Sequence, residues 1–362
     1  MKVKDQPKYL AIAEDLRLAV EEQKLAVGGA LPSHSELVDK YGASVSTIRQ
    51  AISYMARQGW VKARQGRGVF VQRPAAAPAR SADSTTVGFA VFDTSLSIAG
   101  AKCPWHVSDA VNALVYQGAA EVLQRNKREA FYGVFGPGPD SLERFGAFLG
   151  RVSSVLVFES FDQRVLDVLQ EHPHVRPVLL GHPVDDICVD GYSCASVDLS
   201  NAGYLAAQAL GIHNHKKVAF VGQLAGRPNA EMTAGFERAC RQYGLQCRVN
   251  LSILDMNEHQ VAKHLVDDPE CTGVVIVGDL AAGRIQQSLA GLGVQTPRDK
   301  SIVAIGGIPS CYTLSARSMA RVNCLFEELG RQGARLLFSA AMNTRSRVTP
   351  VMFERGDSLR MV

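Results

Sequence analysis

From Thr86 onward the sequence alternates between short apolar runs and amphipathic helical stretches, and no other feature restricts the fold as strongly. Short buried strands separated by helices indicate parallel sheets that are covered on both faces. About 275 residues with this pattern predict an α/β domain of two lobes. The predicted strands are 87–93, 130–135, 154–158, 177–180, 218–222, 273–277 and 301–305, and the predicted helices include 107–124, 142–149, 164–170, 201–210 and 231–243.

The residues that directly follow these strands are candidate contacts for a ligand. Parallel α/β folds bind ligands beside the carboxyl ends of their strands. Asp279 also stands at a strand-to-helix junction, where an acid often serves as the N-cap of the helix, so both roles stay open for it. The candidate pocket residues on this argument are Phe92, Asp93, Glu159, His182, Gln223 and Asp279.

The N-terminal part of the chain has a different pattern, with apolar residues recurring at helical spacing. This spacing predicts helices over 7–23, 33–41 and 44–59. Ser33 and Glu36 have the spacing of a capping box, in which the serine side chain bonds a free N–H at the helix start. The pattern therefore predicts a small helical unit before the α/β region.

Two short β-like runs, 60–64 and 69–72, follow these helices. Gln65-Gly66-Arg67-Gly68 joins the runs, which predicts a hairpin with a tight turn. Three helices followed by a hairpin are the element order of a winged helix-turn-helix, whose third helix lies in the major groove of DNA.

The charge of the chain is divided unevenly along its length. Residues 1–74 carry 12 Lys and Arg against 7 Asp and Glu, a net charge of +5, and the other 288 residues carry 27 against 28. There is no acidic residue between Asp39 and Asp83. An arginine-rich, acid-free stretch beside a neutral remainder favours a module that binds a polyanion such as a nucleic acid. A solvated basic surface is the alternative explanation of the charge. The alternative to a winged helix-turn-helix is a small helical domain with a basic loop for another partner.

The expected DNA-reading surface combines the start of the third helix with the tip of the hairpin. Arg bonds guanine in the major groove, Gln bonds adenine, and Ser or Thr bonds a base or a phosphate. Glycines beside Arg67 allow the backbone to approach the duplex, so that this arginine can reach the minor groove or a phosphate. The candidate DNA-binding residues on this surface are Ser44, Val45, Ser46, Thr47, Arg49, Gln50, Arg64, Gly66, Arg67 and Gly68.

Residues 8–73 resemble the DNA-binding domain of the GntR family of bacterial regulators. The resembling stretches are KYLAIAEDLRLAV, LPSHSELVDKYGASVSTIRQAISYMARQGWV and ARQGRGVFV. Ser35 stands where the family usually has an arginine, which predicts weaker DNA binding or a shifted site. The resemblance implies DNA contacts from Ser33, Ser44, Ser46, Thr47, Arg49, Gly66, Arg67 and Gly68.

The rest of the chain resembles the effector domain of LacI-type repressors, a periplasmic-binding-protein-like fold of type I. The resembling stretches include VDLSNAGYLAAQAL, KKVAFVGQ and RVNCLFEELGRQGARLLF. The resemblance implies two lobes, a small-molecule effector between them, and a repressor that binds operator DNA as a homodimer. It also implies that the helix over 326–337 returns to the first lobe. The combination of both domains resembles arabinose-responsive repressors.

The expected effector site departs from the LacI pattern in two places. Met232 stands where the family usually has an arginine, and the acid expected after the strand ending at Ile305 is missing, with Gly306 in its turn. Arg227 is a candidate replacement for the arginine, and Asp279 is the acid that remains. A sugar needs several such polar partners, so these departures argue against an ordinary pentose or hexose. A less polar effector, or a dimerisation scaffold without an effector, is the alternative.

The sequence points away from an enzyme. It contains no G-x-S-x-G motif, no Walker motif and no Rossmann fingerprint, and its histidine pairs lack metal-ligand spacing. A DNA-binding head fused to an aminotransferase-like domain would need a longer body and a cofactor-binding lysine in its own motif. We therefore expect no catalytic residue, no cofactor and no metal.

The remaining features concern domain boundaries and location. Residues 74–86 are small and contain prolines, which predicts a linker between a DNA-binding domain at 1–73 and an effector-binding and dimerisation domain at 87–362. No apolar run reaches the length of a membrane helix, and the N-terminus lacks a signal-peptide core. The eight scattered cysteines include no C-x-x-C pair. We expect a cytoplasmic protein with no membrane partner.

Overall fold

The computed structural model divides the chain into two compact units, which are described separately. One unit holds residues 1–84 with 189–192, and the other holds 85–188 with 193–362. The predicted linker 74–86 lies outside the described residues, apart from Thr86. The structure describes residues 8–21, 29–57, 60–64, 68–71, 86–92, 106–136, 139–159, 161–183, 187–222, 226–253, 256–308, 318–339 and 346–362.

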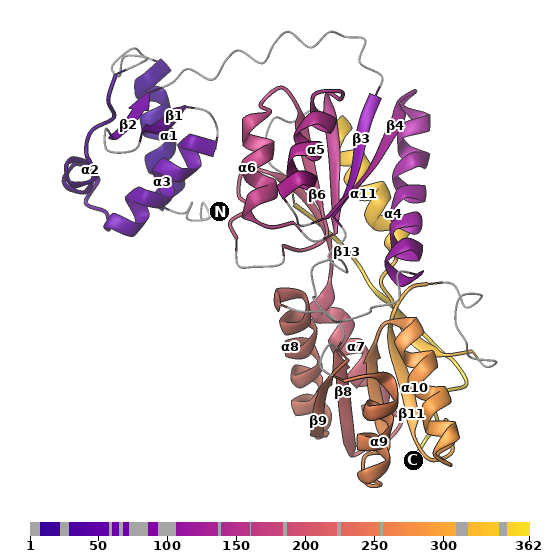
Figure 1. The fold of residues 1–362 in the computed structure, drawn as a ribbon. Coiled ribbons are helices and arrows are strands. Elements are labelled where there is room, and N and C mark those ends of the chain that lie inside the picture. Colours follow the sequence, from indigo (N-terminus) through magenta and orange to yellow (C-terminus); the bar gives the residue numbers. More distant parts are fainter. Residues whose placement is uncertain are drawn as a thin grey trace. The chain divides into compact units, whose positions relative to one another are not determined.

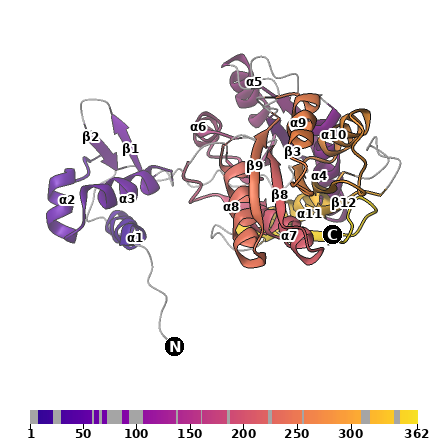
Figure 2. The same cartoon turned by 90° about the horizontal axis from the view of Figure 1, so that it is seen from below.

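The first unit contains three helices followed by an antiparallel hairpin (Figures 1 and 2). This is the predicted winged helix-turn-helix. Its core holds apolar residues from all three helices and both strands, including Leu16, Leu37, Ile48 and Val71. The elements are α1 (Lys8–Glu21), α2 (His34–Tyr41), α3 (Val45–Arg57), β1 (Val61–Arg64) and β2 (Gly68–Val71).

The first lobe of the second unit is a six-stranded sheet in the order β13-β7-β6-β5-β3-β4. All neighbouring strands are parallel, as the alternation of strands and helices predicted. Helices α4 and α11 pack together in this lobe, as do α5 and α6. The elements are β3 (Thr86–Phe92), α4 (His106–Arg125), β4 (Glu129–Phe135), α5 (Pro139–Leu149), β5 (Ser154–Glu159), α6 (Gln163–Glu171), β6 (Arg176–Leu180), β7 (Ser193–Val197), α11 (Phe326–Phe338) and β13 (Ser346–Thr349).

The second lobe is a sheet in the order β14-β12-β11-β10-β8-β9, in which only the β12–β14 pair is antiparallel. Helices α7 and α8 pack together, and α9 packs against α10 (Figure 1). The elements are α7 (Leu199–Ile212), β8 (Lys217–Gly222), α8 (Gly226–Tyr243), β9 (Gln246–Ser252), α9 (Glu258–Asp267), β10 (Gly273–Val277), α10 (Asp279–Gly291), β11 (Ser301–Gly306), β12 (Ala320–Asn323) and β14 (Met352–Glu354).

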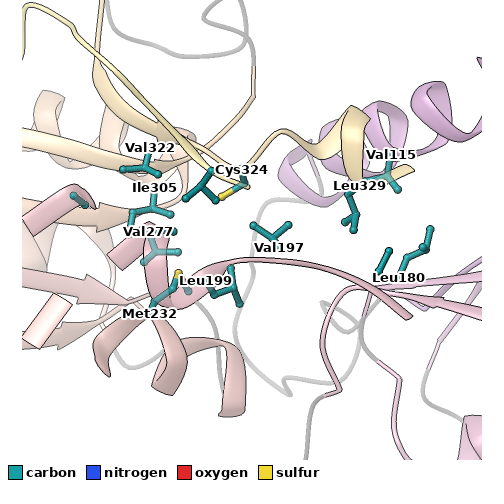
Figure 3. Packing of buried hydrophobic residues seen from close by; sticks show 14 of the residues in the cluster. Val115, Leu180, Val197, Leu199, Met232, Val277, Ile305, Val322, Cys324 and Leu329 are labelled. Atoms are coloured by element: carbon teal, nitrogen blue, oxygen red, sulfur yellow. The ribbon is translucent and has the colours of Figure 1, made fainter. Parts of the chain in front are cut away.

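The chain crosses between the lobes three times, from β7 to α7, from β12 to α11 and from β13 to β14. The implied return of the helix over 326–337 to the first lobe is confirmed, since α11 packs against α4, β6 and β7. One hydrophobic cluster continues through these crossings (Figure 3). It includes Val115 and Leu180 in the first lobe, Val197 and Cys324 at crossings, and Ile305 in the second lobe.

Each lobe contains a pair of helices that meet through glycines. A Cβ on Gly203 of α7 would lie 1.9 Å from the Met232 carbonyl oxygen of α8, and one on Gly235 of α8 would lie 1.8 Å from that of Ser200. In the first lobe, Gly118 of α4 and Gly330 of α11 are as close to the partner backbone. Glycine therefore permits these helices to pack with their backbones in contact.

All seven predicted strands are present, but several elements were not predicted from the sequence. They are β7, β9, β12, β13 and β14 among the strands, and α9 and α10 among the helices. The unpredicted strands carry polar or charged residues, as in Gln-Cys-Arg-Val-Asn of β9, and four of them are short or at sheet edges. Their pairing depends on neighbours that lie far away in the sequence.

Candidate DNA-reading surface and effector region

The entrance to α2 is held by the predicted capping box. The Ser33 backbone N–H donates to Glu36 Oε2 at 2.7 Å, and the Glu36 N–H donates to Ser33 Oγ at 3.3 Å. The Ser33 hydroxyl also donates to Glu36 Oε2 at 2.8 Å, and this bond together with that from the Ser33 N–H holds the pKa of Glu36 below its usual value. Gly42 then ends the helix in the left-handed conformation, with φ of 53°. The short turn to α3 is thus fixed at both ends.

Helix α3 separates an apolar face from a polar one. Ile48, Ala51 and Met55 are fully buried in the core of the first unit. Ser44 caps the helix, since the Thr47 N–H donates to Ser44 Oγ at 3.2 Å. The opposite face is a strip of exposed residues, which we call the α3 strip: Val45, Ser46, Arg49, Gln50 and Ser53.

The hairpin pairs β1 with β2 in the register Val61 with Val71 and Arg64 with Gly68. Gly68 has a φ of +96°, a conformation that favours glycine. The Leu31 N–H donates to the Val69 carbonyl at 2.7 Å, which ties the segment before α2 to the hairpin. Gly66, Arg67 and the side chain of Arg64 lie outside the described residues.

The structure thus brings together one group of the predicted DNA-binding residues. Ser44 and the first two turns of α3 form a continuous surface, on which Thr47 is half-buried. Ser33 is exposed at the start of α2, in the same unit. The α3 strip offers hydroxyl, guanidinium, amide and apolar groups, which is the chemistry that reads base edges in the major groove.

The predicted effector residues are more scattered. Phe92 lies at the end of β3, but its ring is buried at 4.9 Å from that of Phe145 and 5.5 Å from that of Phe135. Met232 is also buried, in the cluster between α7 and α8. Glu159 ends β5 in the left-handed region, with a φ of 80° that is uncommon outside glycine. Asp93 and Gln223 lie outside the described residues.

His182 and Arg227 are brought together through Glu231, although they belong to different lobes. His182 Nδ1 lies 3.4 Å from Glu231 Oε2, and Arg227 Nε donates to Glu231 Oε1 at 2.8 Å. His182 Nε2 donates to the Val197 carbonyl at 2.9 Å. Burial lowers the pKa of His182, and the Glu231 carboxylate acts in the opposite direction. The three side chains form a polar contact between the first lobe and α8.

Asp279 is almost completely buried, and both of its oxygens accept hydrogen bonds. Oδ1 accepts from Arg321 Nη1 at 3.0 Å, and Oδ2 accepts from the N–H groups of Gly307 and Ile308 at 2.8 and 3.0 Å. A Cβ on Gly306 would lie 2.0 Å from Asp279 Oδ2. Gly306 therefore makes room for the carboxylate, and the two predicted residues belong to one buried polar cluster.

The sequence did not identify Arg321 or Glu231 as partners in these clusters. Arg321 is a single arginine in the short strand β12, and its side chain is only 8% exposed. It also donates from Nη1 to the Ile308 carbonyl at 2.7 Å. The nearby Asn323 donates to Glu354 Oε1 at 2.7 Å and accepts from the Leu325 N–H at 2.9 Å. The contacts of Arg321 with Asp279 and of Glu231 with His182 leave no local pattern in the sequence, because the partners lie 42 and 49 positions apart.

None of the described helices is both long and apolar enough to cross a membrane. The described residues include no group of three or more His, Cys, Asp or Glu side chains arranged to hold a metal ion.

Comparison with known protein families matches a segment of each unit. Residues 8–71 match the model for bacterial regulatory proteins of the gntR family, and residues 207–357 match that for the periplasmic binding protein-like domain. These matches confirm both resemblances. The chain carries a GntR-type DNA-binding domain followed by a periplasmic-binding-protein-like domain.

Curated relatives are similar over limited parts of the chain. An HTH-type transcriptional regulator of Mycobacterium tuberculosis is 44% identical over 68 residues, which are 19% of this chain and 25% of the relative. The arabinose metabolism transcriptional repressor of Geobacillus stearothermophilus is 27% identical over 124 residues, 34% of this chain and 30% of the relative. The chain thus spans less than a third of the length of either relative.

Solved structures share the fold over a larger part of the chain. The transcriptional regulator CelR in complex with cellobiose has a TM-score of 0.64 and 18% identity, covering 87% of this chain and 91% of its own. A LacI family regulator from Enterococcus faecium with bound ribose has a TM-score of 0.62 and 17% identity, covering 76% of this chain and 99% of its own. These neighbours establish a LacI-type fold.

Proposed function

We propose that this chain is a transcriptional repressor that binds operator DNA as a homodimer and responds to a small molecule. The observation that carries the proposal is the exposed α3 strip on a capped helix, within a segment that matches the gntR family. In this proposal the N-terminal unit reads one half-site of double-stranded DNA, and a second copy reads the other. Such a protein acts in the cytoplasm, where the operator is.

The charge and chemistry of the first unit support the DNA partner. Its acid-free stretch from Lys40 to Arg73 would neutralise phosphates, which contributes affinity without sequence preference. Arg49 and Gln50 would contribute specificity, because bidentate contacts with guanine and adenine discriminate between bases. Ser33 and Ser44 would position α2 and α3 on the sugar-phosphate backbone of the DNA, in line with the DNA contacts that the family resemblance implies.

The fold of the second unit supports an effector between its lobes. Three crossings and one continuous core connect the lobes, and the polar contact of His182 with Glu231 bridges them. Effector binding would change the relation of the lobes, and effector and operator affinities would then be coupled reciprocally. Cellobiose and ribose occupy the neighbours CelR and the Enterococcus regulator.

The chemistry around Asp279 favours an effector that is less polar than a free sugar. Asp279 is committed to Arg321 and to two backbone N–H groups, and Met232 is buried where the family usually has an arginine. A polyhydroxylated ligand needs several convergent polar partners. The same observations favour a second candidate function, in which residues 87–362 serve only as a scaffold for dimerisation.

The edge strand β4 is the surface we assign to the homodimer. Tyr132 and Val134 are 44% and 48% exposed on this strand, which pairs with β3 alone among the described strands. Edge strands with exposed apolar side chains are prone to pair with another chain. A second copy would cover them.

The first test is capture of sheared genomic DNA by the full-length protein at near-physiological salt, followed by sequencing. The proposal predicts a few enriched sites that share a two-fold-symmetric motif, because each protomer of a dimer reads one half-site. Arg49→Ala should weaken binding to that motif by about 1–3 kcal/mol. Arg241→Ala, on the exposed surface of α8, is the matched control and should change nothing.

Two results would contradict the DNA assignments. Absence of any enriched motif would contradict the proposed function. Equal losses for Arg49→Ala on operator and random DNA would make this residue a phosphate contact instead.

The effector is tested by measuring the melting temperature of the full chain with arabinose, ribose, cellobiose and less polar metabolites. An increase in melting temperature with one of these compounds supports a sensor. If no compound raises the melting temperature, the result supports residues 87–362 as a scaffold for dimerisation.

A further inference from the structure

We propose that Val45 determines operator specificity by packing against the C5-methyl group of a thymine in the major groove. This inference rests on the proposed function, because it requires that α3 enters the groove of operator DNA. The inference adds to the proposed function that the operator carries an A·T pair opposite Val45. No other residue of the α3 strip offers an apolar side chain to a thymine methyl group.

Val45 is an apolar side chain in a position where the fold does not need one. It is 50% exposed, and it is the one large hydrophobic residue with that exposure among the described residues of the first unit. Single exposed hydrophobic residues are common on protein surfaces. The argument therefore depends on where Val45 lies and on which roles its neighbours already fill.

The neighbours of Val45 fill every local structural role at the start of α3. Ser44 is the cap, and its hydroxyl lies 2.8 Å from those of both Ser46 and Thr47. Ala43 and Ile48, on either side of the cap, are buried in the core and fix the entry of the chain into the helix. Valine is also a modest helix former because its branched side chain loses rotamer freedom. Neither capping nor packing accounts for Val45.

The place of Val45 on the α3 strip gives it a function in DNA reading. As the first residue of α3 it lies one helical turn from Arg49, so both project from the same face. The N-terminal residues of a recognition helix contact base edges. The strip is otherwise polar, and its Ser, Arg and Gln side chains match hydrogen-bonding edges. In the major groove only thymine presents a methyl group, and apolar side chains read it.

The test uses the full-length chain and DNA selected from a random duplex library, with the library selection also testing the proposed function. In the selected consensus, each thymine is replaced singly by deoxyuridine, which removes the C5-methyl group alone. One thymine per half-site should be sensitive, with affinity falling roughly fourfold, the ratio expected for exposing one methyl group. Val45→Ala should bind the thymine and uracil duplexes equally.

Two further variants serve as controls. Val45→Thr keeps one methyl group at nearly the same shape and should retain part of the preference for thymine. Val348→Ala removes a 60% exposed valine from β13 in the other unit and should leave the preference unchanged. Melting temperatures of all variants establish that they are folded.

The outcomes separate the inference from the function on which it rests. If a consensus is selected but no thymine is sensitive to loss of its methyl group, Val45 does not read thymine, while DNA binding stands. Equal sensitivity in the wild type and Val45→Ala also overturns the inference. A selection that enriches no sequence contradicts the proposed function and, with it, the role of Val45.

Discussion

Asp279 and Arg321 form a buried ion pair. Their side chains are 1% and 8% exposed, so neither charge is solvated by water. The two charges neutralise each other. In addition, two backbone N–H groups donate to Asp279, and the Ile308 carbonyl accepts a hydrogen bond from Arg321. A buried pair of this kind adds little net stability over an apolar pair, but its separation leaves an unpaired charge in the core.

Arg321→Met is therefore expected to destabilise the second unit strongly. Removal of the guanidinium leaves the Asp279 carboxylate buried with two N–H donors and no counter-charge, which costs about 3–5 kcal/mol. Urea unfolding of the full chain measures the loss. The double variant Asp279→Asn with Arg321→Met removes both charges and keeps an oxygen acceptor for Gly307 and Ile308. It should recover a large part of the loss, whereas additive effects would show that the two residues are not coupled.

His215 makes the stability of the second unit dependent on pH. Burial lowers the pKa of His215 to about 4, from about 6.5 in an unfolded chain. Between these values the unfolded chain binds a proton that the folded chain does not. The contribution of His215 to the free energy of unfolding therefore has its full value above pH 6.5, and it falls by about 3 kcal/mol as the pH decreases toward 4.

Urea unfolding at a series of pH values tests this linkage. His215→Gln can keep a hydrogen bond with Thr272, which His215 Nδ1 contacts at 2.8 Å, but it does not titrate. This variant should lose most of the slope between pH 6.5 and 4. His259→Gln, at an exposed position of α9, is the control and should retain the slope. An unchanged slope in His215→Gln would assign the pH dependence to other groups.

At the scale of elements, each lobe is assembled on a pair of helices with touching backbones. Gly203 and Gly235 allow the contact of α7 with α8, and Gly118 and Gly330 allow that of α4 with α11. The close approach lets the helices exclude water along their length, and they cover the cluster that passes through the crossings. The packing of α11 on α4 also anchors the chain where it returns to the first lobe.

Gly330→Ala and Gly203→Ala should each destabilise the second unit by about 1–3 kcal/mol or more. The added Cβ lies 1.9 Å from a backbone oxygen in both cases, so a whole helix must move to relieve the overlap. Gly291→Ala, at the end of α10, is the matched control, because no atom lies within 4 Å of its Cβ. It should be neutral or stabilise by up to about 1 kcal/mol. Similar effects at all three positions, measured by urea unfolding, would contradict this explanation.

For the molecule as a whole, the important fact is that the two units have separate hydrophobic cores. The described core of the first unit contains residues between Ile12 and Val71. The described cores of the second unit begin at Val87 and share no residue with it. Because cooperativity follows shared packing, each unit should unfold as a unit of its own.

Calorimetry of the full chain should consequently show two transitions. Ser33→Ala removes the cap of α2, costs about 1 kcal/mol and should lower only the transition of the DNA-binding unit. Gly330→Ala should lower only the other transition. Operator DNA should raise the transition temperature of the DNA-binding unit, because it binds this unit only when it is folded. A single transition that both variants shift would show that the units unfold together.

The candidate site was predictable where its features are local. The cap at Ser33, the cap at Ser44 and the outward face of α3 follow from spacing within a few residues, so they could be identified before the fold was known. The partners of Asp279 could not. A carboxylate at the end of a strand fits a ligand contact as well as an internal ion pair, and only the position of Arg321 on β12 distinguishes them.

Local sequence patterns were sufficient to predict the class of fold and the order of its domains. Apolar periodicity, capping residues and turn residues act over short segments, and these segments predicted the winged helix and the parallel α/β architecture. The short polar strands, the reciprocal glycine contacts and the partners of buried charges became visible only in the folded chain. These depend on atoms brought together from distant segments, and the free energy of a buried charge depends on its neighbours in space.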